Sequence, residues 1–293
     1  MSIASQEPTT TTGAVTTVPV PDDAPGTFSV KRESPLRLLP PPAVFGALVI
    51  GVWYFVSYRV LDRKRRFLLV PPHEVWSKGF RDGPAFHDML SGLWSSGKVA
   101  MWGLAIAIAL GFAIAIVMSQ SKLVERAVFP YTVVLQATPI LAIVPLIGFW
   151  FGYGFQSRVF IAVLISLFPI VVNTLFGLLG ADQGLHDLLT LHNAGRFTRL
   201  VRVQFPAALP AVFAGLRISA GLSVIGAIVG DFFFGQGEVG IGQLLKRYAN
   251  KLEGAHLLAA VILSCSLGVA VFITFGWLSN RIVGKWAPST RGR

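Results

Sequence analysis

The residues with the clearest potential for recognition chemistry are three arginines, Arg196, Arg199 and Arg202, which recur at helical spacing in the segment 187–210. An Asn-Ala-Gly sequence precedes them and two prolines follow them. The segment lies between two apolar blocks that are each long enough to cross a membrane, and a plain loop between spans needs none of these features. We therefore predict that the segment is a docking element for another protein.

The pattern of this segment predicts a helix, a break and a second helix. Asn193 is among the residues best suited, after glycine, to a left-handed turn. Pro206 and Pro210 are expected to end the second helix before the next span. The second helix carries an apolar stripe at i, i+3 and i+4 spacing, formed by Phe197, Leu200 and Val201. The arginines fall largely on its other side. An interfacial helix lying on anionic headgroups would show the same pattern and stays an alternative.

Two other motifs and the histidines do not indicate a nucleotide site or a metal site. The stretch 92–98 fits the start of a phosphate-binding loop, but Val99 stands where Ser or Thr should hold Mg²⁺. The stretch 235–240 matches a dinucleotide fingerprint, but it follows a predicted membrane helix and not a strand. The five histidines have no metal-ligand spacing. We find no catalytic pattern in the spans, so the sequence predicts neither a nucleotide site nor an enzyme.

The composition is that of a membrane protein. Of 293 residues, 53% are hydrophobic and only 13% are charged, whereas soluble domains carry about 25% charged residues. The net charge of +11 lies in short basic clusters beside apolar blocks, where it anchors helix ends to headgroups more simply than it binds nucleic acid. The single cysteine, Cys265, excludes an intrachain disulfide and a cysteine-based metal site.

Six membrane spans are expected, and both termini then lie on the same side. Three prolines in the third span predict a kinked or broken helix in the interior of the assembly. The region 63–98 is expected to be an extramembrane loop with a surface helix, and 231–255 a glycine-rich loop with a short helix. The expected spans cover residues 43–60, 99–118, 128–151, 159–179, 211–229 and 257–278.

Basic tails at both ends place the termini in the cytoplasm under the positive-inside rule. The segment 187–210 then also faces the cytoplasm, in a multi-pass protein of the plasma (inner) membrane. The cluster Arg63–Arg66 opposes this topology because it would lie outside, and so do Lys246, Arg247 and Lys251.

Ionisable residues are scarce in the predicted spans. Arg217 lies near the start of the fifth span, and Asp231 is expected just past the end of that span. Proton relays and voltage sensors need such groups, so an ion-coupled pump is disfavoured. GxxxG spacing at 148/152 and 226/230 fits packing within one subunit as well as a dimer contact. Candidates for a translocation path, with structural hydrogen bonds as the alternative role, are Gln136, Thr138, Pro139, Asn173 and Ser223.

At the segment 187–210 the chain resembles the permease subunit of binding-protein-dependent ATP-binding-cassette (ABC) importers. Asp187-Leu188-Leu189 stands at the Glu-Ala-Ala position of that family's cytoplasmic loop, Asn193 at its glycine and Phe205-Pro206 at its closing hydrophobic-Pro pair. The stretches PAALPAVFAGLRISAGLSVIGAIVGDF and LQATPILAIVPLIGFWFGYG are also similar to the family. The branch resembled is the nitrate, sulfonate and taurine group, which includes thiamine-precursor pyrimidine and riboflavin permeases.

The resemblance implies an all-α integral membrane protein with six transmembrane helices in the type I ABC importer arrangement and a cytoplasmic coupling helix. It covers residues 43–285 and implies a permease domain there, with its coupling loop at 182–210. The Thr-, Pro- and Ser-rich residues 1–42 are expected to form a disordered cytoplasmic tail because they can bury little apolar surface, and residues 286–293 a basic cytoplasmic tail. The chain would bind no cofactor, because ATP and Mg²⁺ belong to a partner ATPase dimer. A second permease copy would complete a homodimer, and an external binding protein would deliver a small solute.

Coupling to the ATPase would run through residues 187–205. A stand-alone channel or facilitator for a small solute remains the alternative function. The residues implied in coupling are Asp187, Leu191, Asn193, Ala194, Gly195, Arg196, Phe197, Arg199, Leu200 and Pro206.

Overall fold

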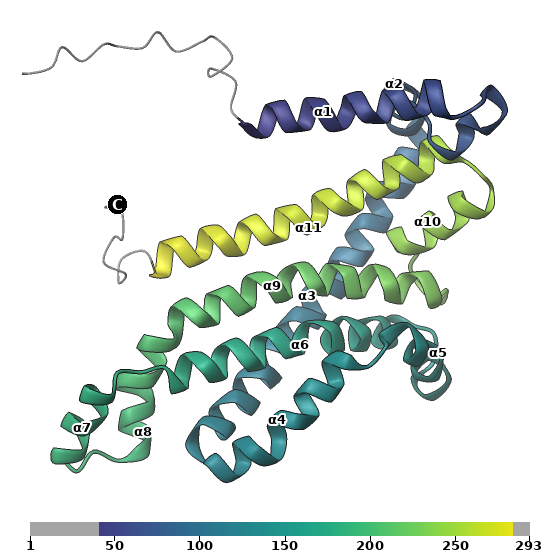
Figure 1. Ribbon diagram of the computed structural model, residues 1–293. Helices are drawn as coiled ribbons and strands as arrows, with labels where there is room; N and C mark the ends of the chain where they lie inside the picture. The colour runs from purple at the N-terminus through teal and green to yellow at the C-terminus, as the bar shows by residue number, and fades with distance from the viewer. Residues whose placement is uncertain (1–40, 284–293) are drawn as a thin grey trace, which may run out of the picture. The chain divides into compact units, whose positions relative to one another are not determined.

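The computed structural model describes residues 41–283, and the regular structure in that range is helical (Figure 1). The predicted tails over 1–42 and 286–293 lie outside this range, apart from the first two residues of helix α1 (Pro41–Phe55). The chain divides into two units, residues 1–48 and 49–293. The first contributes only the beginning of α1, and the second contains everything described below.

The first span ends in a folded-back connection. Helix α1 continues into the π turn η2 (Val56–Val60). Short helices η3 (Arg63–Leu68), α2 (Pro72–Glu74) and η4 (Val75–Phe80) follow. Trp53 Nε1 donates a hydrogen bond to the Val70 carbonyl at 3.1 Å, and Ser57 Oγ donates to the Leu69 carbonyl at 2.8 Å. These bonds fasten the connection to the end of the first span.

Helix α3 (Gly83–Gln120) is a single helix of 38 residues. The expectation of a separate surface helix before a span starting at residue 99 was therefore wrong. The polar first half has no proline after Pro84, and the helix begins there because proline suits a first turn. Gly92 then lets α3 lie against the start of α10, since a Cβ at this position would meet Leu244 Cδ1 at 3.0 Å and the Ile241 nitrogen at 3.1 Å.

The third span is broken, as predicted. Helices α4 (Lys122–Ala137) and α5 (Ile140–Phe151) meet at an angle of 97°. Thr138 has ψ 127° in front of Pro139, because the residue before a proline is disfavoured in the helical region. Pro130 and Pro145 are accommodated inside the two helices, so only one of the three prolines makes the break. Whether the assembly encloses this span stays a prediction.

Helices α6 (Phe155–Leu179) and α9 (Phe205–Phe233) form the most extensive pairing of elements, and α3 joins them in the main core (Figure 1). Gly226 explains the close approach, because a Cβ there would lie 2.7 Å from the Cα of Ala162. At Gly230 a Cβ would lie 3.0 Å from the Cα of Arg158. The GxxxG spacing in α9 thus serves packing within the chain.

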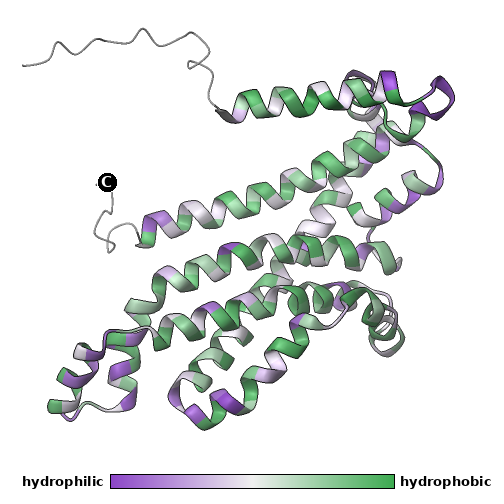
Figure 2. Cartoon of the chain, viewed as in Figure 1, coloured by the Kyte–Doolittle hydropathy of each residue, from purple (hydrophilic) through white to green (hydrophobic). Residues whose placement is uncertain are grey.

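Helices α10 (Ile241–Asn250) and α11 (Gly254–Val283) complete the described chain. Within residues 41–283, five helices are long and apolar enough to cross a membrane, or six when α4 and α5 count as one broken span. This agrees with the predicted six. Hydrophilic residues gather in the connecting segments and at helix ends (Figure 2), and the long helices are mostly apolar.

Candidate functional site

The predicted docking segment begins with helix α7 (Gln183–Leu191), which has well-formed ends. The Asp182 carboxylate accepts a hydrogen bond from the Gly184 N–H at 2.6 Å and caps the first turn. At the other end the Ala194 N–H donates to the Leu189 carbonyl at 2.9 Å, and the Asn193 N–H to the Thr190 carbonyl at 3.0 Å. This is the Schellman pattern of helix ends.

Asn193 adopts φ 51°, which is the left-handed conformation predicted from its sequence position. The segment therefore turns sharply after α7, and the expected break between two helices is confirmed. Ala194 and Gly195 carry the chain from the turn to the next helix, with Gly195 in an extended conformation at its N-cap.

The second helix does not end at the prolines. Helix α8 (Arg196–Arg199) passes through the π turn η5 (Leu200–Gln204) directly into α9. The Phe205 N–H donates to the Leu200 carbonyl in this wider turn. Pro206 occupies the first turn of α9, where the π turn absorbs the register change and a missing N–H is tolerated. The prediction that Pro206 and Pro210 terminate the helix was wrong.

Apolar side chains of the segment are exposed. Leu191 is 82% exposed and Phe197 is 76% exposed, while Leu188 and Val201 are each about half exposed. Leu200 instead packs against the main core. Of the predicted stripe, Phe197 and Val201 thus face outward, joined by two leucines of α7.

The three arginines divide into two roles. Arg199 is partly buried, and its Nε donates to the Ala194 carbonyl at 3.0 Å, so it braces the turn after Asn193. Arg196, Arg202 and Asp187 are exposed. Figure 1 shows α7 and α8 at the end of α6 and α9 that lies away from α10. The segment therefore carries exposed apolar side chains and exposed cations at one end of the helix pair.

The candidate path residues do not gather around one cavity. Gln136 lines a cavity of about 210 Å³ against α6, and Ser223 lines another of about 460 Å³ between α3, α9 and α11. Thr138 Oγ1 donates to the Val134 carbonyl at 2.7 Å, and Asn173 Nδ2 to the Pro169 carbonyl at 2.8 Å. Ser223 Oγ likewise bonds within its own helix. Pro139 lies exposed at the bend, and a path role for these residues stays a prediction.

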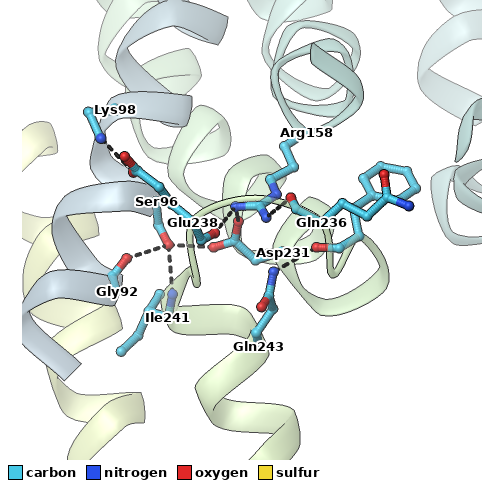
Figure 3. A network of polar contacts seen from close by, with 10 residues as sticks. Gly92, Ser96, Lys98, Arg158, Asp231, Gln236, Glu238, Ile241 and Gln243 are labelled. Carbon is cyan, nitrogen blue, oxygen red and sulfur yellow. Dashed lines mark hydrogen bonds and ion pairs between the residues drawn. The ribbon is translucent and has the colours of Figure 1, made fainter. Parts of the chain in front are cut away.

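A buried ion pair at the other end of α9 escaped the sequence argument. Arg158 is 1% exposed and Asp231 is 0% exposed, and Arg158 Nη1 lies 3.3 Å from Asp231 Oδ1 (Figure 3). Asp231 does not lie past the end of the fifth span, as expected, but inside α9. Arg158 stands at the edge of an apolar block, and a charge in that position was the available signal.

The ion pair joins four parts of the chain. Arg158 donates to the carbonyls of Gln236 and Glu238 at 2.8 Å each, and thereby holds the loop 234–240 (Figure 3). Ser96 of α3 donates its hydroxyl to Asp231 and accepts the Ile241 N–H at 2.9 Å. Helices α3, α6, α9 and the start of α10 are therefore fixed to one another at this end.

A polar cavity of about 660 Å³ lies beside this network, with Glu238 in its lining. Lys98 Nζ lies 2.5 Å from Glu238 Oε2 at its edge. The hydrogen bond from Lys98 lowers the pKa of the Glu238 carboxyl, whose side chain is exposed. The cavity is also lined by Asp88, Ser91, Ser95 and Arg247. In the described range no group of three or more His, Cys, Asp or Glu side chains is arranged to hold a metal ion.

Comparison with known proteins identifies the family. Residues 107–284 match the family model described as "Binding-protein-dependent transport system inner membrane component". A probable ABC transporter permease protein of Haemophilus influenzae is 31% identical over 85% of this chain and 98% of its own length. The formylaminopyrimidine transport permease protein ThiX of Halalkalibacterium halodurans is 35% identical over 61% of this chain and 70% of its own. Relatives named for riboflavin, aliphatic sulfonate and nitrate transport represent the same branch that the sequence resembles.

A solved structure agrees on the fold. A chain of the inward-facing MetNI methionine ABC transporter superposes with a TM-score of 0.56, covering 71% of this chain and 100% of the other at 17% identity. The all-helical architecture and the predicted spans thus match an importer permease. The chain belongs to the family of binding-protein-dependent transport system inner membrane components, and is a non-catalytic, multi-pass permease subunit of an ABC importer.

Proposed function

We propose that the exposed surface formed by Leu188, Leu191, Phe197 and Val201, which we call the coupling surface, rests on the ATPase subunit of the importer. The observation that carries this proposal is the exposure of Leu191 and Phe197, at 82% and 76%. Large apolar side chains grouped beside polar ones mark an interaction site. The neighbouring Arg196 and Arg202 add charge that can pair with acidic groups on a partner.

The coupling surface is connected to the core without a flexible joint. Residues Arg196–Phe233 run as one helical stretch, and Leu200 and Val203 pack inward at its beginning. Arg199 ties the preceding turn to the same stretch through the Ala194 carbonyl. Movement of an ATPase against Phe197 would therefore be transmitted along α9 to the far end, where Asp231 is bound to α6.

The proposal extends to the other parts of the importer. The coupling surface faces the cytoplasm, and both termini lie there too. The ATPase partners bind ATP and Mg²⁺, and an external binding protein delivers a small solute to the side that carries the loop 234–240. A second copy of the permease domain (43–285) completes the path. Transport of a small solute is supported by the relatives named for formylaminopyrimidine and riboflavin.

The test is to replace the two most exposed residues of the coupling surface. Leu191→Ala and Phe197→Ala should each reduce co-purification of the ATPase subunit with the tagged chain, and the double variant should abolish uptake of a labelled substrate. The matched control is Leu252→Ala, because Leu252 is 62% exposed but follows α10 at the other end. Unchanged ATPase recovery in the double variant, with normal expression, would contradict the proposal.

A further inference from the structure

Arg217 is an exposed cation in the interior of a span. It lies in α9, twelve positions after Phe205 and sixteen before Phe233, and its side chain is exposed. Among the described residues, no carboxylate forms an ion pair with it. A charge at such a depth is costly unless a partner or a polar surface satisfies it. The coupling surface and the Arg158–Asp231 pair do not involve it.

The depth of Arg217 can be estimated from the length of α9. At about 1.5 Å per residue, 29 residues extend about 43 Å, which matches a bilayer including its headgroups. The Cα of Arg217 then lies about 18 Å from the first residue of α9, or about 11 Å inside the hydrocarbon edge on that side. Helical side chains lean toward the N-terminus, so its long side chain reaches toward the headgroups on the side of the coupling surface.

The guanidinium of Arg217 contacts α11. The guanidinium carbon of Arg217 lies 3.9 Å from the centroid of the Phe272 ring. Its Nε and Cζ lie 3.3 Å from the position that a Cβ of Gly276 would occupy. Gly276 is one helical turn nearer than Phe272 to Val283, the end of α11. The guanidinium therefore lies in the space that the missing side chain of Gly276 leaves beside α11.

We propose that Arg217, Phe272 and Gly276 form a binding site for the phosphate of an anionic phospholipid, in the leaflet next to the coupling surface. The guanidinium group offers two parallel N–H donors to a phosphate while its face stays stacked on Phe272. Basic positions between membrane helices bind anionic headgroups in this way. Arg281 lies on the same helix nearer its end, where it stacks on Trp277 and not on Phe272. The lipid thus supplies the counter-charge that the described chain does not.

The test measures lipid binding by the purified full-length chain in detergent. Phosphatidylglycerol, phosphatidylcholine and inorganic phosphate are added separately, and retained lipid is measured by native mass spectrometry alongside the melting temperature. The wild type should retain phosphatidylglycerol and be stabilised by it. Arg217→Gln should bind it about tenfold more weakly, as expected for the loss of a charge-assisted hydrogen bond. Arg281→Gln is the matched control and should bind nearly as the wild type does.

Two further variants keep the test decisive. Gly276→Leu fills the space beside the guanidinium but keeps the arginine, so it should lose lipid binding even if Arg217→Gln fails to fold. Arg217→Lys keeps the charge without the planar group and should bind with intermediate strength. Equal retention of phosphatidylglycerol by the wild type, Arg217→Gln and Gly276→Leu would overturn the proposal, as would equal stabilisation by inorganic phosphate, which would point to a soluble anion. Because lipid binding is read directly, the result does not depend on the coupling assay.

Discussion

At the scale of single residues, we expect substitutions in the buried Arg158–Asp231 pair to reduce the stability of the chain most. Both side chains are buried, and each supplies the opposite charge for the other. Arg158 also donates hydrogen bonds to two carbonyls of the loop 234–240. Removing one member of such a pair leaves an uncompensated charge, which costs far more than the pair contributes net. The pair therefore acts less as a source of stability than as a constraint on which elements lie together.

Asp231→Asn should lower the free energy of unfolding by about 3–5 kcal/mol, because it leaves Arg158 buried without a counter-charge. The measurement is thermal or denaturant unfolding of the purified chain. Arg158→Met combined with Asp231→Asn should recover part of the loss, since the unpaired charge is then gone. Similar unfolding of the single and double variants would show that the ion pair is not what makes Asp231 important.

The exposed pair at the edge of the same network should behave differently. Glu238→Gln removes the partner of Lys98, but the Glu238 side chain is exposed, and exposed ion pairs contribute little. Because Lys98 lowers the pKa of Glu238, its contribution is present above the ordinary pKa of a glutamic acid and is lost as the pH falls through the lowered value. The melting temperature of Glu238→Gln should match the wild type at pH 7, and a large loss there would contradict this account.

At the scale of elements, two features decide how the helices are placed: the glycines between α6 and α9, and the turn after α7. The glycines set how closely the two central helices approach. The turn sets where the coupling surface lies. Each can be tested with a substitution that has a matched control in the same helix or at the same position.

Gly226→Ala should destabilise the chain by about 1–3 kcal/mol, the usual cost of overpacking, because the added Cβ would lie 2.7 Å from the Cα of Ala162. Gly221→Ala is the control in the same helix, since no atom lies within 4 Å of its added Cβ. That control should be neutral or stabilising by up to about 1 kcal/mol through helix propensity. Equal melting temperatures for the two variants would show that Gly226 does not limit the approach of the helices.

Asn193→Val should destabilise the turn between α7 and α8, because a β-branched residue at φ 51° is strained by about 1–3 kcal/mol. The turn would then open and move α7 away from α8. Recovery of the ATPase subunit with the tagged chain should fall. Asn193→Gly adopts the same conformation without strain and should retain wild-type recovery, so a defect of equal size in both variants would exclude the backbone explanation.

At the scale of the whole molecule, the two ends of α9 differ in the groups that they carry. One end carries the coupling surface, and the other carries the Arg158–Asp231 network with its polar cavity. A helical stretch from Arg196 to Phe233 connects them. The proposed orientation places these ends on opposite sides of the membrane.

The orientation can be checked by cysteine labelling, because Cys265 is the only cysteine in the sequence. In a Cys265→Ser background, Leu252→Cys should react with a membrane-impermeant maleimide in intact cells. Thr190→Cys, in α7, should react only after the membrane is opened. Both positions are exposed, so the difference reports sidedness and not burial. The reverse labelling pattern would place the coupling surface outside and refute the proposed topology.

Much of the fold follows from local properties of the sequence. Long apolar blocks predict the spans because backbone polar groups must be satisfied within a bilayer. The three prolines of the third span predict its break, which the structure places at Pro139, and Asn193 predicts the left-handed turn, because these residues act through local backbone conformation. The prediction failed at Pro206, since the π turn of residues 200–204 that absorbs this proline depends on neighbours packed against the helix.

The sequence by itself determined that the chain is a helical membrane protein, and its motifs indicated an importer permease with a segment at 187–210 that we propose docks on a partner. Only the tertiary structure decided which charges meet. Arg158 and Asp231 are 73 positions apart, and nothing local to either residue shows that α6 and α9 bring them together. The same holds for Arg217 and Phe272, whose contact depends on how α11 lies along α9. Apolar pattern and backbone preference act over a few residues, whereas partners for buried or membrane-embedded charges are selected by the packing of whole helices.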